Sequence, residues 1–113
     1  MKIKQQKQIE LFLIEEFGNE KGNALFEKQD KLLNEIIKNN KDKSKNQMKT
    51  LTQTILPRIA LYKVFLKEEL SEETSYEYIR KYMLEKIAAP KHAQMKKMEK
   101  VPGFYFLYSK IFL

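Results

Sequence analysis

The chain has 113 residues, of which 42% are hydrophobic and 33% are charged, and its formal net charge is +7. This length and composition suit a single folded domain with a modest core and exclude a disordered chain. The chain has no cysteine and a single histidine, His92, which excludes disulfides, thiolate metal sites and a His-rich zinc site within these residues. We therefore expect neither a bound metal nor a cofactor.

The positive charge raises the question of nucleic-acid binding. Of 22 basic residues only Arg58 and Arg80 are arginines, whereas base-edge recognition relies on the bidentate guanidinium group. The composition therefore argues against a nucleic-acid partner. The apolar stretch near the amino terminus is short and is followed by Glu15 and Glu16. It is neither a signal peptide nor a membrane span, so we expect a cytoplasmic protein without a membrane partner.

Apolar residues in the first part of the chain recur at helical spacing. Ile9, Leu13 and Phe17 stand four apart, which places their side chains on one face of a helix over residues 3–17. Gly18 follows at the position of a C-terminal cap. The first predicted element is therefore a helix that ends at this glycine.

A second helix is predicted directly after it. Asn19 is the expected N-cap, and Glu20 lies in the first turn, where a negative charge suits the helix dipole. The helix should run as far as Lys38, with an apolar stripe of Leu25, Leu32, Leu33, Ile36 and Ile37. Because almost no loop separates the two helices, we expect an antiparallel pair.

Residues 39–47 contain no apolar residue and several lysines. Such a run could bind phosphate or could serve as a mobile linker. Polar runs of like charge without aromatic residues are usually solvated loops. The linker is therefore the favoured interpretation.

The strongest helical pattern covers residues 50–70. Ile55, Ile59, Tyr62 and Leu66 recur at helical spacing in a broad apolar stripe, which predicts a central, buried helix. Pro57 lies inside this pattern and lacks a backbone donor. It should kink the helix unless the first turn begins near residue 54.

Ser71 is the expected N-cap of the next helix, which should continue through residue 89 and end at Pro90. Thr74 and Glu77 offer a second capping box one turn later. Residues 91–100 form a short basic amphipathic segment, and residues 101–113 form an aromatic terminal segment. With no pattern typical of strands, the sequence predicts one all-α domain over residues 1–113, a compact bundle of five or six helices.

No sequence motif of a nucleophile, phosphate loop, dinucleotide site or metal site is present. Neighbouring glutamates such as Glu72 and Glu73 point about 100° apart on a helix, so they are better explained as solvent and capping charges than as an acid/base pair. His92 has no carboxylate three or four positions away that could orient it as a base. The catalytic residues, if any, stay unknown.

Two residues of the central helix are candidates for ligand binding. Arg58 follows Pro57 in the most apolar helix, where it either holds an anionic ligand or, as long basic side chains commonly do, reaches solvent or pairs with a glutamate. Tyr62, with Tyr76 and Tyr82, either lines a small-molecule pocket or belongs to the core with its hydroxyl at the rim. We take Arg58 and Tyr62 as the candidate ligand-binding residues.

Residues 55–83, ILPRIALYKVFLKEELSEETSYEYIRKYM, and the downstream VPGFYFLYSKIF are more distinctive than helical periodicity requires. Together they resemble the amino-terminal half of the L-2-amino-thiazoline-4-carboxylic acid hydrolase family, and the likeness extends over essentially the whole chain. The motifs that carry it are a basic helical start, a Ser-capped helix and two spaced groups of residues: Leu56, Pro57, Ile59, Ala60, Leu61 and Tyr62, and Pro102, Gly103, Phe104 and Tyr105.

The resemblance implies a hydrolase that opens a small cyclic amidine acid by adding water. The family's second half, with its cysteine, aspartate and histidine motifs, has no counterpart here, so no catalytic residue carries over. We therefore expect a helical portion that is not catalytic alone, with a pocket beside Tyr62. The aromatic residues 101–113 would then meet the missing half or a second copy of the chain. The alternative is a stand-alone helical interaction module, a homodimer or apolar-ligand binder. A third alternative, ranked last, is a nucleic-acid binder that uses the lysines of residues 38–49 and 91–100.

Overall fold

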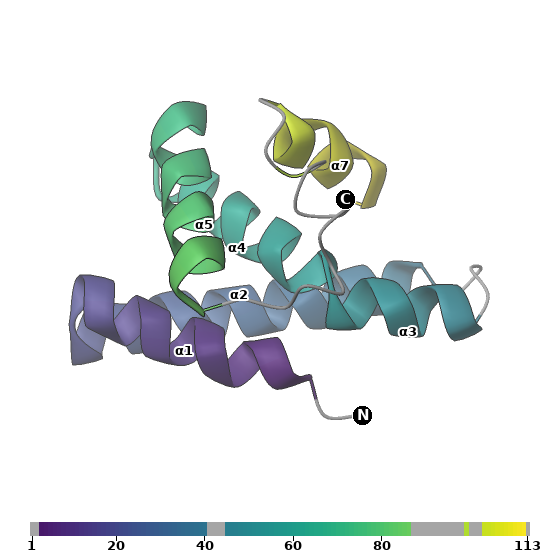
Figure 1. The fold of residues 1–113 in the computed structure, drawn as a ribbon, viewed down its shortest axis with the longest axis horizontal. Helices are drawn as coiled ribbons and strands as arrows, with labels where there is room; N and C mark the ends of the chain where they lie inside the picture. The colour runs from purple at the N-terminus through teal and green to yellow at the C-terminus, as the bar shows by residue number, and fades with distance from the viewer. Residues whose placement is uncertain (1–2, 41–44, 87–98, 100–102, 113) are drawn as a thin grey trace.

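The computed structural model describes residues 3–40, 45–86, 99 and 103–112. These residues form helices only, which confirms the all-α prediction for the described part of the chain. Figure 1 shows α1 and α2 side by side with α4 above them, α5 upright next to α4 with its lower end against α1, and α7 above α4. The helices are α1 (Lys4–Phe17), α2 (Asn19–Asn39), α3 (Lys45–Gln53), α4 (Leu56–Lys67), α5 (Glu72–Lys86) and α7 (Phe104–Phe112).

Helices α1 and α2 form the predicted antiparallel pair, joined by a single residue, Gly18. Gly18 has φ 89°, which favours glycine, and its N–H donates to the carbonyl of Ile14 as a C-terminal cap. The prediction that Asn19 caps α2 is wrong. The carbonyl of Gly18 already accepts the N–H of Gly22 at 2.8 Å, so Gly18 is the N-cap and Asn19 is the first helical residue.

The predicted helix over residues 50–70 is divided into α3 and α4 at Thr54 and Ile55. Pro57 lies in the first turn of α4, where its missing N–H has no carbonyl to serve. The helix is therefore not kinked at Pro57, because a new helix begins close to residue 54, which is the second of the two predicted possibilities. The predicted loop, residues 39–47, overlaps the end of α2 and the start of α3, and residues 41–44 lie outside the described part of the chain.

Helix α4 is the centre of the core, as its broad apolar stripe predicted. Every residue from Leu56 to Phe65 except Lys63 is buried, and α4 packs against α2, α3, α5 and α7. The core joins apolar side chains of α1, α2, α4 and α5 to Phe104 and Tyr105 of α7. The aromatic terminal segment therefore folds back onto the bundle through its first turn.

The start of α5 confirms Ser71 as an N-cap, because the N–H of Thr74 donates to Ser71 Oγ at 3.0 Å. The prediction of a second capping box one turn later, formed by Thr74 and Glu77, is wrong. Thr74 and Glu77 lie inside the helix, and the Thr74 hydroxyl accepts a hydrogen bond from that of Ser71 at 2.9 Å. The expected helix end at residues 87–90 and the basic segment 91–100, apart from Glu99, lie outside the described residues.

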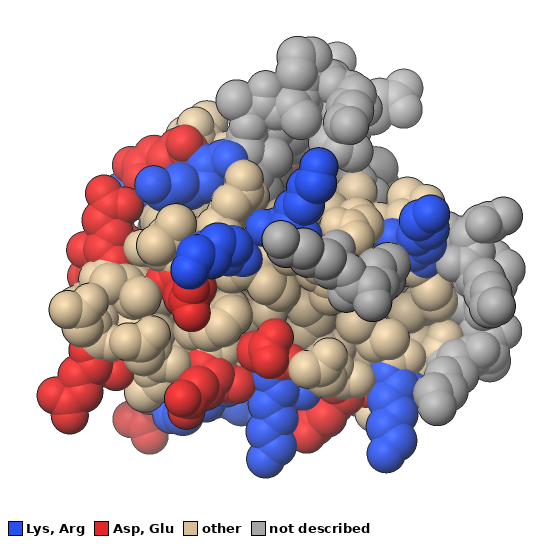
Figure 2. Space-filling view, turned by 90° about the horizontal axis from the view of Figure 1, so that it is seen from below, with Lys and Arg blue, Asp and Glu red and all other residues tan. Residues whose placement is uncertain are grey.

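No described helix is both long enough and apolar enough to cross a membrane. Lysine, arginine, aspartate and glutamate side chains alternate over the α1–α2 side of the molecule (Figure 2). On the described part of that face the charges of both signs are therefore interspersed and do not form a continuous basic patch.

Candidate functional site

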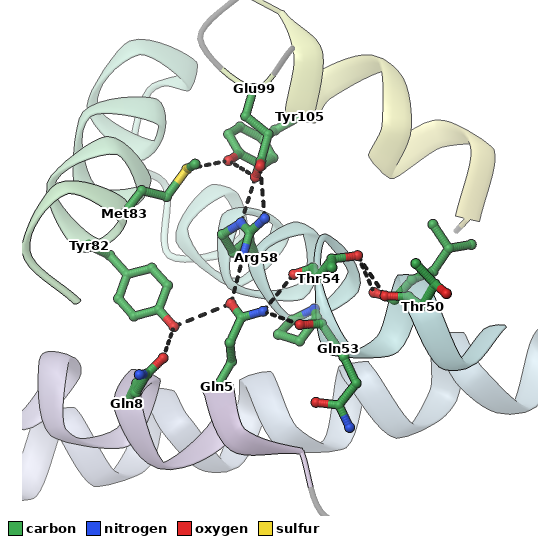
Figure 3. Close-up of polar contacts among 12 residues, drawn as sticks. Gln5, Gln8, Thr50, Gln53, Thr54, Arg58, Tyr82, Met83, Glu99 and Tyr105 are labelled. Atoms are coloured by element: carbon green, nitrogen blue, oxygen red, sulfur yellow. Dashed lines mark hydrogen bonds and ion pairs between the residues drawn. The ribbon is translucent and has the colours of Figure 1, made fainter. Parts of the chain in front are cut away.

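Arg58 lies in the interior, where its side chain pairs with Glu99 (Figure 3). Its Nε and Nη2 donate to the two carboxylate oxygens at 2.5 and 2.8 Å, and Nη1 donates to Gln5 Oε1 at 2.8 Å. Burial by itself lowers the pKa of Arg58, but the hydrogen bond and charge of Glu99 more than offset this, so the pKa is raised and the guanidinium stays charged. An anionic ligand at Arg58 would have to displace Glu99.

Tyr105, from the first turn of α7, completes the carboxylate site. Its hydroxyl donates to Glu99 Oε1 at 2.5 Å and lies 3.1 Å from Met83 Sδ. Burial raises the pKa of Tyr105 well above its ordinary value, and the charge of Glu99 raises it further. The phenol is therefore a neutral donor that ties α7 to the ion pair on α4.

Gln5 of α1 connects this ion pair to the break between α3 and α4. Its Nε2 donates to the carbonyls of Gln53 and Thr54 at 2.8 and 2.7 Å. Gln53 is the last residue of α3, where helix carbonyls lack intrahelical donors, so the Gln5 amide supplies a donor there. Its Oε1 accepts from Arg58 and, at 3.3 Å, from the hydroxyl of Tyr82.

Two sequence signals point to this network. Gln5 and Gln29 each occupy a position of an apolar helical stripe, four residues from Ile9 and Leu25 respectively. A buried amide in such a stripe needs partners, and Gln29 donates to the carbonyl of Pro57 at 3.0 Å. The partner Glu99 could not be found in this way, because it comes from a segment 41 positions further along the chain than Arg58.

A hollow of about 470 Å³ lies next to the network. This is within the usual size range of small-molecule sites, roughly 300–1,000 Å³. Tyr105 belongs to both features, because its hydroxyl joins the network and its ring lines the hollow. The lining residues come from α4, α5 and the start of α7: Tyr62, Glu72, Glu73, Tyr76, Glu77, Arg80, Gly103, Tyr105 and Phe106.

Tyr62 is the α4 residue of this hollow. Its side chain is almost fully buried, with 2% exposed, and its ring centre lies 5.7 Å from that of Tyr105. Burial raises the pKa of Tyr62, and the nearby carboxylate of Glu72 raises it further. The Tyr62 hydroxyl forms no hydrogen bond with a described residue, but it is not an enclosed orphan, because Ser75 Oγ alone is a fully buried side-chain atom without a partner in the described part of the chain.

The described residues do not form an acid/base or nucleophilic constellation in this hollow. Its three carboxylates all come from α5, and no separate element brings a partner within reach of them. Ser75 of α5 is buried and is close in sequence to the lining glutamates. Its hydroxyl has no partner in the described part of the chain that could activate it as a nucleophile. No group of three or more described His, Asp or Glu side chains could hold a metal ion.

The two predicted ligand-binding residues therefore lie in adjoining but different places. Arg58 is in the buried network and Tyr62 lines the hollow, with Tyr105 between them. Of the other tyrosines considered, Tyr76 lines the hollow and Tyr82 belongs to the network. Comparisons of the chain with protein-family models, curated proteins and solved structures found no match.

Proposed function

We propose that this chain is the ligand-binding helical portion of a protein similar to the L-2-amino-thiazoline-4-carboxylic acid hydrolases, and that it is not catalytic on its own. The hollow beside Tyr62 would hold a small cyclic amidine acid. The observation that supports this proposal most directly is an open hollow of suitable size beside Tyr62, one of the α4 residues that carry the resemblance.

The charges of the hollow support a ligand of this kind. Arg80 and the carboxylates of Glu72, Glu73 and Glu77 line the same space, and a cyclic amidine acid carries both a carboxylate and an amidinium group. The guanidinium is suited to the first and a glutamate to the second. The lack of an acid/base pair among the described lining residues supports binding without turnover.

The test combines binding and turnover on the same sample. The chain is titrated with 2-amino-thiazoline-4-carboxylate by calorimetry, and the mixture is assayed by chromatography for the ring-opened product. We expect saturable binding without product, and weaker binding by Arg80→Gln. Arg58→Gln is avoided as a probe because it breaks a buried ion pair. Absence of binding at millimolar ligand would overturn the proposal, and product formation would overturn its non-catalytic part.

A second candidate function, a homodimeric interaction module, is favoured by the outer face of α7. Leu107 is 61% exposed, while Phe106 and Tyr108 are only partly buried. Exposed apolar groups on one short helix suit an interface between two copies. Light scattering at micromolar concentration should then give twice the mass of the chain, and Leu107→Glu should give the monomer. A monomeric mass for the unaltered chain would contradict this candidate.

A further inference from the structure

We infer that the hollow between α4, α5 and α7 is a site for a primary ammonium ion carried on a small apolar body. The inference uses the same hollow as the proposed function, but it rests on the lining residues alone and not on the family resemblance. Three features support it: the sign of the charge at the rim, the unused hydroxyl of Tyr62 and the aromatic wall.

The charge around the hollow favours a cation. Three glutamates of α5 face one arginine among the described lining residues. Glu72 and Glu73 are in the first turn of α5, a place where acidic residues suit the helix dipole. The rim is therefore net negative at neutral pH, and a positive ligand group is favoured over a negative one.

The hydroxyl of Tyr62 favours a ligand that forms hydrogen bonds. It is part of a side chain that is 2% exposed and that lines the hollow, yet no described residue pairs with it. Its oxygen is not among the fully enclosed atoms that lack a partner, so it can accept a hydrogen bond from a group that enters the hollow. An ammonium N–H can donate to the phenol oxygen and to the carboxylate of Glu72, whose charge acts on this phenol.

The aromatic wall favours an apolar body beside the charge. The rings of Tyr62 and Tyr76 lie 5.7 and 6.3 Å from that of Tyr105, and Phe106 adds a fourth aromatic lining residue. Aromatic rings attract organic cations and pack against apolar groups. Because the Tyr105 hydroxyl is held by Glu99, this wall is fixed before a ligand arrives, which lowers the cost of binding.

A bare metal ion fits the same residues poorly. The glutamates of the hollow do not converge into a group that could hold a metal, in keeping with the absence of any such group among the described residues. Magnesium and calcium require several oxygen ligands at short distance. A larger cation with a single charged end needs only one or two of the carboxylates.

The inference is tested by nuclear magnetic resonance titration at pH 7 with three probes that share a benzyl group. Benzylamine carries the ammonium group, benzyl alcohol lacks the charge, and benzyltrimethylammonium keeps the charge without N–H donors. We expect benzylamine to bind at least about tenfold more tightly than either of the others, because a charge-assisted hydrogen bond is lost in each. Equal affinity of benzylamine and benzyl alcohol, or binding of neither, would overturn the inference.

Three variants locate the site. Tyr62→Phe keeps the ring and should weaken benzylamine binding by about tenfold, since only a hydrogen bond to a charged group is removed. Glu72→Gln, Glu73→Gln and Glu77→Gln together should abolish it. The matched control replaces Glu20, Glu27 and Glu35 of α2 by glutamine, which removes the same charge from residues that do not line the hollow, and should leave binding within about twofold. Binding unchanged in the Glu72, Glu73 and Glu77 variant would place the cation elsewhere.

Failure of this inference can be told apart from failure of the proposed function. Binding of benzylamine but not of 2-amino-thiazoline-4-carboxylate would support the ammonium site and contradict the resemblance to the hydrolases. Binding of the thiazoline acid alone, weakened by Arg80→Gln, would show that the guanidinium and not the acidic rim selects the ligand. That second outcome would overturn the ammonium site and leave the proposed function standing.

Discussion

The α1–α2 pair and the attachment of α7 to α4 are built by different means. In the α1–α2 pair the backbones approach so closely at Gly22 that an added Cβ would lie 2.6 Å from Ile14 Cα. The polar contacts there are partly buried hydrogen bonds in which Gln6 pairs with Gln29 and also donates to Asp30, with no ion pair among them. Helix α7 is held to α4 by Phe104, Tyr105 and a buried ion pair between Arg58 and the preceding Glu99.

This difference separates two physical roles. Close apolar packing stabilises the α1–α2 pair directly. A buried ion pair contributes little net stability, because removing two charges from water offsets most of their attraction, but it strongly disfavours arrangements in which either charge is left alone. The network therefore fixes where α7 lies, and with it the hollow that α7 helps to line.

The largest effect is expected from breaking the ion pair. Arg58→Ala leaves Glu99 buried without its partner and also removes a donor to Gln5. We expect a loss of about 3–5 kcal/mol in the free energy of unfolding, measured by urea denaturation. The double variant Arg58→Met with Glu99→Leu should recover most of this loss, because no charge is then left alone. If the double variant were as unstable as Arg58→Ala, the pair would be a net source of stability.

The next effect is expected in the α1–α2 pair. Gly22→Ala places a methyl group against the backbone of Ile14, and we expect a loss of about 2–3 kcal/mol by the same measurement. Gly18 is the matched comparison, because it has φ 89° and ψ 168° but open space around it. Its replacement costs backbone strain of about 1–3 kcal/mol.

The size of the new side chain distinguishes the two glycines. At position 22 valine should be clearly worse than alanine, because the obstacle is the neighbouring backbone. At position 18 alanine and leucine should be similar, because the strain is in the chain conformation and not in the space. An equal cost of alanine and valine at position 22 would contradict close packing as the reason for Gly22.

High pH should act on the network and not on the α1–α2 pair. Burial raises the pKa of Tyr82 and of Tyr105 above the value of about 10 that holds in the unfolded chain. The stability that these two phenols contribute is therefore complete below about pH 10 and is lost as the pH rises toward their folded-state pKa values.

Urea denaturation between pH 7 and 11 measures this effect. Each tyrosine that stays neutral in the folded state should reduce the free energy of unfolding by about 1.4 kcal/mol per pH unit above pH 10. Tyr82→Phe and Tyr105→Phe should each make the loss of unfolding free energy smaller by about 1.4 kcal/mol per pH unit above pH 10. A slope unchanged in both variants would mean that other groups govern alkaline unfolding.

The sequence predicted those parts of the fold that depend on local spacing. Gly18, Ser71 and the apolar stripes placed the helix ends and identified α4 as the centre, because caps and periodicity act over a few residues. The division of α3 from α4 was only half foreseen at Pro57, because the donor that stabilises the break, Gln5, is 48 positions away from Gln53. Tertiary packing forms the Arg58–Glu99 pair and brings α5 and α7 together beside Tyr62. No short-range sequence pattern encodes such contacts.

The smallest effect tests how far the hollow depends on the start of α5. Ser71→Ala removes the side-chain cap on the N–H of Thr74 and should cost about 1 kcal/mol of unfolding free energy. The same turn carries Glu72 and Glu73, which line the hollow, so fraying there should also weaken benzylamine binding. Ser71→Asp can still cap the helix and should restore both properties. If Ser71→Ala lowered stability but left benzylamine binding unchanged, the first turn of α5 would not shape the cation site, and the carboxylate that matters would be that of Glu77, one turn further along.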